Sequence, residues 1–300
     1  MRRIAAALIL GGTAALAAET SAPHDEAFWR KLSASGFAVP EGAKAGELLV
    51  EASALLGSPD PTLRDGVAYG AAAEWILRKK LIEPPELRRL LGLWTPNLKK
   101  GVGEKGDDRV LLRSFSALEL SVLAARDVQA PFLEPAELTT LVDDALAYLA
   151  AEKDLRGYDA KKGWLHATAH TADLLKFLAR NPRVPPADAA RILSGIGAKA
   201  REAGEVFAWG EDERLASAVL AVLRRGDIDA ASWSTWLDGL AGTGSGLWDA
   251  PSLDVKQFAA VQNAKHLLAR LHVLLYSVPE PAPKLVEARA QVMGALEKLP

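Results

Sequence analysis

Long segments that mix apolar Ala and Leu with polar Glu, Lys and Arg follow one another along the chain, a composition that favours helices. Proline and glycine separate these segments at regular intervals, and no alternating runs rich in Val, Ile and Thr indicate strands. The pattern predicts helices over residues 25–35, 44–56, 62–80, 84–93, 107–126, 135–151, 163–180, 188–203, 211–225, 229–240, 253–276 and 284–299.

The predicted helices fall into pairs, in which a shorter helix is followed by a turn and a longer one. Their spacing is close to the period of about 40–47 residues that HEAT and armadillo repeats show. We therefore predict an all-α fold, a right-handed α-solenoid of HEAT-like antiparallel helix pairs. A closed α/α barrel is the alternative, since it is also built from sequential helix pairs. No linker rich in Ser and Gly divides the chain, so residues 19–300 are expected to form one domain.

Residues 1–18 have the pattern of a secretory signal peptide. Two arginines after the first methionine precede an apolar run that is shorter than the about 20 residues needed to span a bilayer. Ala15 and Ala17 then satisfy the small-x-small rule for signal peptidase. We expect cleavage after Ala17 or Ala18, and a mature chain that is exported to a bacterial periplasm or beyond and has no transmembrane segment. The alternative is an uncleaved N-terminal anchor.

Composition excludes several kinds of chemistry. The chain has no cysteine, which rules out disulfides, thiolate zinc sites, iron–sulfur clusters and cysteine nucleophiles. Its net charge is −2, so no overall positive field would attract nucleic acid or an anionic membrane. We therefore expect no nucleic-acid partner.

Polar residues interrupt the first half of several longer predicted helices. Stacked in register, these helices would align their polar groups in one row across a concave face, which we call the polar ridge. A loop before the third of these helices carries Arg156 and could close over the ridge. The predicted binding groove comprises Arg64, Asp65, Arg113, Ser114, Arg156, Trp164, Asp212, Arg214 and Asn263.

The segment GWLHATAHTADLL, which starts at Gly163, carries the most distinctive polar pattern. At 100° per residue, His166, His170 and Asp173 share one narrow helical face, away from the apolar face that would pack. Histidines four residues apart match helical zinc ligands, and a carboxylate could complete three ligands with one open position. The alternatives are acid–base chemistry without a metal, and a structural role in which both imidazoles hydrogen-bond to neighbouring repeats.

No glutamate follows His166, so the common HExxH metalloprotease motif is incomplete. A catalytic base would have to come from Asp173 or from Glu211 or Glu213. Acids in a first helical turn are also favoured by the free N–H groups and the helix dipole, which offers a purely structural explanation.

Arg113 lies among apolar residues and should have a carboxylate partner if it is buried. The sequence suggests Asp65, Asp173 or Asp212 as that partner. Arg214 would then be free to pair with a neighbouring helix.

These residues also carry a resemblance. The blocks DPTLRDGVAY, RSFSALELSVLAARD, RGYDAKKGWLHATAHTADLL, GEDERLASAV and QNAKHLLARL resemble the bacterial family catalogued as domain of unknown function 2785. The resemblance covers roughly residues 45–275 and implies an all-helical, HEAT-like fold. It implies no catalytic residues, because the family has no established activity.

Three hypotheses follow for function. The first is an exported binding or scaffold module whose polar groove holds a peptide, a glycan fragment or a small anionic ligand. The second is a zinc-dependent hydrolase that uses His166, His170 and Asp173, with Glu211 or Glu213 as base. The third is a purely structural exported protein in which the polar ridge forms internal ion pairs.

Overall fold

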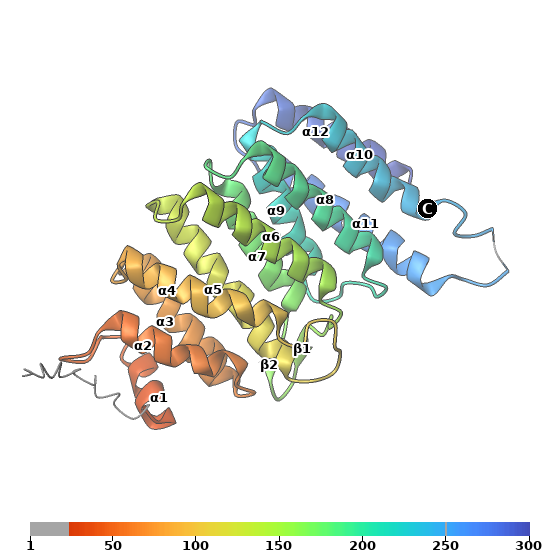
Figure 1. Cartoon of the computed structure of the whole chain (residues 1–300). Coiled ribbons are helices and arrows are strands. Elements are labelled where there is room, and N and C mark those ends of the chain that lie inside the picture. Colours follow the sequence, from red (N-terminus) through yellow and green to blue (C-terminus); the bar gives the residue numbers. More distant parts are fainter. Residues whose placement is uncertain (1–23, 250) are drawn as a thin grey trace, which may run out of the picture.

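The computed structural model describes residues 24–249 and 251–300, and most of this part of the chain is helical (Figure 1). The all-α prediction is confirmed. The elements up to the middle of the chain are α1 (Glu26–Ala34), α2 (Ala45–Ala52), η1 (Ser53–Gly57), η2 (Thr62–Tyr69), α3 (Gly70–Ala72), η3 (Ala73–Arg78), α4 (Pro84–Trp94), η4 (Thr95–Lys99), α5 (Arg109–Gln129) and α6 (Pro135–Ala151). The predicted signal peptide, residues 1–18, lies outside the described residues.

The second part of the chain begins with a short hairpin and then returns to helices. Its elements are β1 (Tyr158–Asp159), β2 (Gly163–Trp164), α7 (Ala167–Arg180), α8 (Pro186–Glu202), α9 (Glu211–Arg225), α10 (Ala230–Ala241), η5 (Gly242–Gly244), α11 (Val255–Tyr276) and α12 (Pro283–Glu297).

The helices form two layers. In the first layer α5, α7, α9 and α11 lie side by side, and the continuous helical segment η2–α3–η3 lies beside α5. In the second layer α4, α6, α8 and α10 pack against the first, and α12 packs on α10 and α11. The helices α1 and α12 lie at opposite ends of the stack (Figure 1), so the described chain does not close into a barrel. The right-handed, HEAT-like winding of the pairs stays a prediction.

Local sequence signals explain why several predicted boundaries agree with the structure. The helices α4 and α6 each begin with proline at their first position. Before these prolines, Glu83 and Glu134 form reciprocal capping boxes with Glu86 and Glu137. The helix α9 ends at Gly226, whose φ of 75° suits a residue without a side chain. Such caps act within a few residues, which is why the sequence alone shows them.

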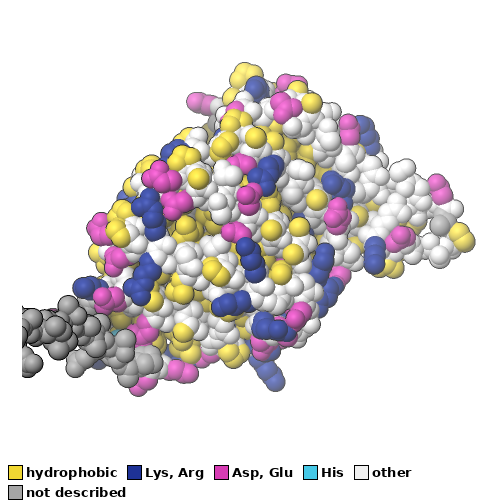
Figure 2. Space-filling view, in the orientation of Figure 1, with side chains coloured by type: hydrophobic (Ala, Val, Ile, Leu, Met, Phe, Trp, Pro, Cys, Tyr) yellow, Lys and Arg dark blue, Asp and Glu magenta, His cyan; other side chains and the backbone are white. Residues whose placement is uncertain are grey.

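One continuous cluster of buried hydrophobic side chains extends from Trp29 to Leu299. Because α5 and α7 have neighbours on both sides and a second layer behind them, they bury polar residues together with apolar ones. On the face seen in Figure 2, basic and acidic side chains are interspersed. None of the helices in residues 24–249 and 251–300 is long and apolar enough to cross a membrane.

The helix predicted over residues 163–180 is wrong at its start. Gly163 and Trp164 belong to β2, and α7 begins at Ala167. His166 precedes the helix with a φ of 53°, so the helical spacing between His166 and His170 does not apply. The prediction that the His–His–Asp face points away from the packing is also wrong. His166, His170 and Asp173 are all buried, because α5 and α9 cover α7 on both sides.

Candidate functional site

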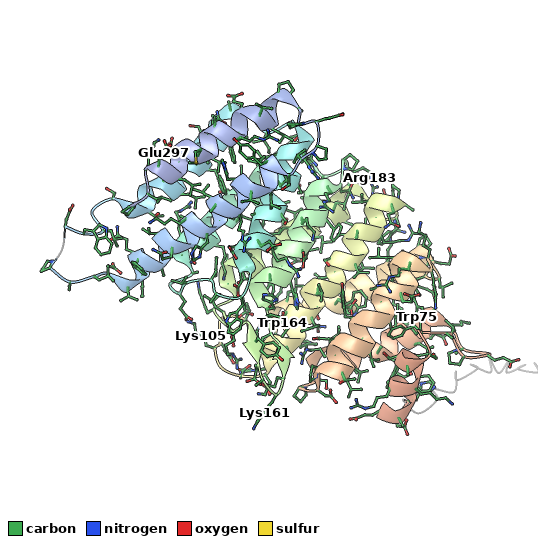
Figure 3. All side chains as sticks on the ribbon, turned by 180° about the vertical axis from the view of Figure 1, so that it is seen from behind. Trp75, Lys105, Lys161, Trp164, Arg183 and Glu297 are labelled. Carbon is green, nitrogen blue, oxygen red and sulfur yellow. The ribbon has the colours of Figure 1, made fainter. Side chains whose placement is uncertain are left out.

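The β1–β2 hairpin stands at one end of the first layer, between α6 and α7 (Figures 1 and 3). Tyr158 pairs with Trp164 across its two antiparallel strands. A carboxylate oxygen of Asp159 accepts hydrogen bonds from the backbone N–H groups of Lys161 and Lys162, at 2.8 and 2.9 Å, and so closes the turn. Gly163 adopts a φ of 71°, and a Cβ added there would lie 2.9 Å from Pro61, so the hairpin requires glycine at this position.

Arg64, on the helical segment η2, holds the hairpin through hydrogen bonds to its backbone. Its fully buried guanidinium donates hydrogen bonds to the backbone carbonyl oxygens of Ser58, Lys162 and Trp164, at 2.8, 2.6 and 3.0 Å. It also lies 4.5 Å from the ring centre of Phe115. Hydrogen bonds from a charged donor contribute about 1.5–3 kcal/mol each, so Arg64 fixes the turn and the second strand of the hairpin on the helical layer.

Asp65 is the neighbouring charge. One of its oxygens lies 3.3 Å from Nε of Arg64, and burial raises the pKa of Asp65 to about 6. These two residues of the predicted groove therefore meet. The hydrogen bonds of Arg64, however, go to backbone carbonyl groups of Ser58 and the hairpin.

His166 joins the hairpin to the loop that enters α9. Its Nε2 lies 2.8 Å from the carbonyl oxygen of Trp209, so this nitrogen carries the proton and donates. Its ring stacks on Trp164, with ring centres 4.6 Å apart and planes 17° from parallel. Burial lowers the pKa of His166, which favours the neutral imidazole.

His170 on α7 forms a hydrogen bond with the hydroxyl of Ser114 on the neighbouring helix α5. Its Nδ1 lies 2.8 Å from Oγ of Ser114, and that hydroxyl also donates to the carbonyl oxygen of Leu165. The hydroxyl has only one proton, so Nδ1 of His170 is the donor in its own hydrogen bond. Burial, followed by the nearby His166, holds the pKa of His170 well below its usual range. Two predicted site residues, Ser114 and His170, are thus brought together as a neutral hydrogen-bonded pair.

Asp173 forms ion pairs instead of pointing at the imidazoles. It lies 2.6 Å from Nζ of Lys176 on its own helix, and it also accepts from the guanidinium of Arg214 on α9. The prediction that Arg214 pairs with a neighbouring helix is therefore in agreement with the structure. The three proposed zinc ligands do not converge. Within the described ranges, no group of three or more His, Asp or Glu side chains is placed to hold a metal ion.

The two candidate bases have different surroundings. Glu211 is buried and accepts the backbone N–H of Trp209 at 2.8 Å. Glu213 is exposed on α9. Between them Asp212 lies 3.5 Å from Arg270 on α11. The acidic cluster thus serves the start of its own helix and one link to the next, as the capping explanation expects.

The partners suggested for Arg113 are wrong. Its guanidinium is fully buried and binds both carboxylate oxygens of Glu152, at 2.7 and 3.2 Å, and the carbonyl oxygen of Lys100 at 3.0 Å. Glu152 caps the end of α6 and is also buried, so this ion pair joins the two layers.

Two further members of the predicted groove hold loops. Arg156 binds both oxygens of Asp154 and the carbonyl oxygen of Asp107 at 2.7 Å. The side chain of Asn263, which is fully buried on α11, accepts the N–H of Phe207 at 2.8 Å and donates to the carbonyl oxygen of Glu205 at 2.9 Å. Most residues of the predicted groove therefore form hydrogen bonds or ion pairs that connect helices and loops, and they do not line an open groove.

The exposed feature that these contacts support is a cluster of three rings. Tyr158, Trp164 and Trp209 are 48%, 40% and 47% exposed, and we call them the aromatic surface. Tyr158 and Trp164 have ring centres 5.1 Å apart, and each lies 6.5 Å from the centre of Trp209. Gly157 lets Trp209 approach, because a Cβ there would come within 2.0 Å of its ring. In Figure 3, Trp164 lies at the same end of the molecule as Lys105 and Lys161.

Sequence reasoning named Trp164 but missed Tyr158 and Trp209 as functional candidates. The available signal was an aromatic residue beside glycine in each of two loops, in RGYD and in AWGED. Nothing in the sequence shows that these loops meet, since the contact depends on α7 and α9 lying side by side.

The family model described as protein of unknown function (DUF2785) matches residues 98–273, more than half of the chain. No curated protein and no solved structure matches the chain. The match includes the hairpin, both histidines, and the helices α5, α7 and α9 on which the aromatic surface is built.

Proposed function

Since this chain belongs to the DUF2785 family, whose description assigns no activity, we propose a function from its own geometry: an exported protein that binds glycans on its aromatic surface. The observation that carries the proposal is that three large aromatic side chains are each at least 40% exposed and yet held in fixed contact. Exposed aromatic residues that remain ordered are typical of binding sites.

The supports beneath the rings make the surface preorganised. Trp164 is held by the Arg64 hydrogen bond to its carbonyl and by its stacking on His166. Trp209 is held through its backbone, by His166 at its carbonyl and by Glu211 at its N–H. A binding surface that is already ordered loses little conformational entropy when its ligand arrives, which favours affinity.

The geometry favours a sugar over a compact cation. Rings with centres 5.1–6.5 Å apart touch one another, so they form a continuous surface rather than a cage with room inside. The faces of aromatic rings are electron-rich, and they attract the polarised C–H groups on one side of a sugar ring. The hairpin tip adds the charged side chains of Asp159 and Lys161, which can bind sugar hydroxyls at the rim.

The same geometry gives the histidines a supporting role. Both imidazoles already engage protein atoms, His166 at Trp209 and His170 at Ser114, and burial favours their neutral forms. They therefore order the loops beneath the aromatic surface.

Export is the second part of the proposal. It is supported by the charged start, the short apolar run and the small residues at 15 and 17, as in secretory signal peptides. An exported location would bring the aromatic surface into contact with glycans of the cell envelope or surroundings.

A glycan array tests the proposal. The mature chain, labelled with a fluorophore at a cysteine introduced far from the hairpin, is applied to arrays of neutral and acidic oligosaccharides. We expect a defined set of bound glycans, and loss of these signals in Trp209→Ala. Trp248→Ala is the matched control, because Trp248 is 66% exposed but lies in the segment before α11. No bound glycan, or equal binding by Trp209→Ala, would overturn the proposal. Binding to a parallel peptide array and to no glycan would show that the ligand is a peptide.

A further inference from the structure

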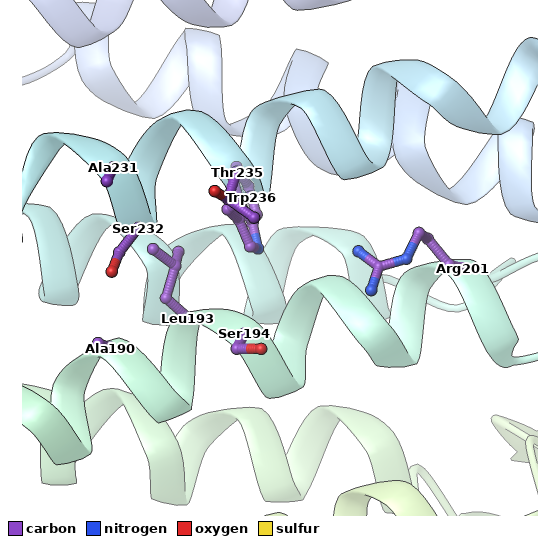
Figure 4. A pocket seen from close by; sticks show the side chains of 8 residues that line it. All are labelled: Ala190, Leu193, Ser194, Arg201, Ala231, Ser232, Thr235 and Trp236. Carbon is purple, nitrogen blue, oxygen red and sulfur yellow. The ribbon is translucent and has the colours of Figure 1, made fainter.

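A groove lies between α8 and α10, in the layer opposite to the one that supports the aromatic surface. The groove encloses about 340 Å³ and is lined by Leu193, Ser194 and Arg201 from α8 and by Thr235 and Trp236 from α10, among others (Figure 4). Among the described residues that line it, none is acidic. This volume is in the range of small-molecule sites.

Trp236 has a buried hydrogen-bond donor without an acceptor. The residue is 4% exposed, and its indole Nε1 has no partner among the described residues. Other buried tryptophans behave differently. Trp75 donates to the carbonyl oxygen of Phe37 at 2.8 Å, and Trp233, which stacks on Trp236, donates to Gln291 at 2.6 Å. A buried donor left unpaired costs about 1–3 kcal/mol, so the exception at Trp236 calls for an acceptor.

Arg201 supplies a charge at the same place. Its guanidinium points along the groove toward Trp236 (Figure 4), and no described carboxylate lies within ion-pair distance of it. Gly197 shows that the two donors converge. A Cβ added to Gly197 would lie 2.7 Å from Nε1 of Trp236 and 3.2 Å from a terminal nitrogen of Arg201. Gly239 leaves room for the same guanidinium from the other side, with a Cβ position 3.1 Å from it.

We propose that this groove binds a small organic carboxylate, whose two oxygens take the guanidinium of Arg201 and the indole N–H of Trp236. Two adjacent N–H donors, one of them charged, match the two oxygens of a carboxylate. The hydroxyls of Ser194 and Thr235 lie on the two walls and offer further donors. Leu193 and the ring of Trp236 give the remainder of the ligand an apolar surface, which favours a carboxylate with a short hydrocarbon part. The site does not depend on the proposed glycan binding.

Titration of the full mature chain by ¹H–¹⁵N NMR tests this proposal through the indole N–H signals. The signal that disappears in Trp236→Phe identifies Trp236. We expect hexanoate or benzoate to shift this signal in a saturable way, whereas hexanamide, which has the same chain without the charge, leaves it in place. Arg201→Gln should weaken binding by at least about tenfold, the ratio that corresponds to 1.4 kcal/mol. Arg89→Gln, which removes an exposed arginine on α4, should bind as the unaltered chain does.

Three outcomes would overturn the inference. The first is an indole signal that does not respond to either carboxylate at tens of millimolar. The second is equal response in Arg201→Gln, which would separate the shift from the guanidinium. The third is saturable binding of inorganic phosphate with no response to carboxylates, which would identify phosphate, and not a carboxylate, as the kind of ligand that the groove binds. The NMR spectrum of each variant reports directly whether it is folded, so a loss of binding is not confused with a loss of structure.

Discussion

The imidazole Nε2 of His166 lies 2.8 Å from the carbonyl oxygen of Trp209, and this one hydrogen bond joins the loop before α7 to the loop before α9. The same imidazole stacks on Trp164. One buried side chain therefore supports two of the three rings of the aromatic surface. His166 thus holds the binding surface in place and does not itself contact a ligand.

Replacing His166 by alanine should loosen the aromatic surface. The change removes a buried hydrogen bond and a stacked pair, and we expect a loss of about 1–3 kcal/mol in the free energy of unfolding. Urea unfolding measures this loss, and acrylamide should quench the total tryptophan fluorescence more strongly, because Trp209 becomes more accessible. His266→Ala is the control, because His266 is exposed on α11 and should change neither quantity. Unchanged stability and quenching in His166→Ala would contradict the supporting role.

Replacing Arg64 by methionine should release the hairpin. The guanidinium serves three backbone carbonyls that would lose their donor, and we expect a loss of roughly 2–5 kcal/mol. Hydrogen exchange should rise first in residues 156–166, before global unfolding. The same exchange pattern in Arg64→Met as in the unaltered chain would show that other contacts hold the hairpin. Arg89→Met, on the exposed side of α4, serves for comparison.

The buried carboxyl group of Glu119 should make the stability of the fold depend on pH. It is 1% exposed on α5, one of its oxygens has no partner among the described residues, and burial holds its pKa well above the usual range. In the unfolded chain the pKa of a glutamate is about 4.3. Above that pH the folded protein binds more protons than the unfolded chain, so this residue makes stability fall as pH rises.

Glu119→Gln removes that titration. We expect the variant to melt several degrees above the unaltered chain at pH 8 and to lose this advantage near pH 4, where both states carry the proton. Melting temperatures across this pH range provide the test, with Glu213→Gln as an exposed control. A stability difference that does not depend on pH would show that Glu119 is not the titrating group.

Helix boundaries depend on residues close in sequence, whereas contacts between helices depend on residues far apart in sequence. The helices over 135–151 and 211–225 were predicted at their observed bounds, because proline, capping acids and Gly226 act within a few residues. The hairpin was missed, since Gly163 and Trp164 continue a helix-like composition. The positive φ values of Gly163 and His166 keep these residues out of the helix, and composition does not show them. The partner of Arg113 was wrong because Glu152 comes from the other layer.

The contacts of the candidate site also depend on which helices are neighbours. His170 and Ser114 were both named from the sequence, but their contact requires α5 and α7 to be neighbours in a particular register. Periodicity places side chains on the face of one helix and says nothing of which helix covers that face. This is why the supposed open His–His–Asp face is buried.

If the chain is exported through its signal peptide, the mature protein should begin at a defined residue. Produced in a bacterial host with its full sequence, the chain should be recovered from the periplasm beginning at Ala18 or Glu19, because signal peptidase cuts after small residues. Intact mass spectrometry identifies the start. Lysine at position 15 should block cleavage and leave a longer chain on the membrane. A mature protein that retains residues 1–18 with its native sequence would contradict the signal-peptide interpretation and favour an N-terminal anchor.

The most direct test of the central claim is calorimetry on one glycan selected from the array, with the unaltered chain, Trp209→Ala and Trp248→Ala side by side. Trp209→Ala should raise the dissociation constant at least about tenfold, which corresponds to about 1.4 kcal/mol, because the change removes one of the three rings that contact the sugar. Trp248→Ala should match the unaltered chain. Equal dissociation constants for all three proteins would contradict the assignment of the aromatic surface as the glycan-binding site.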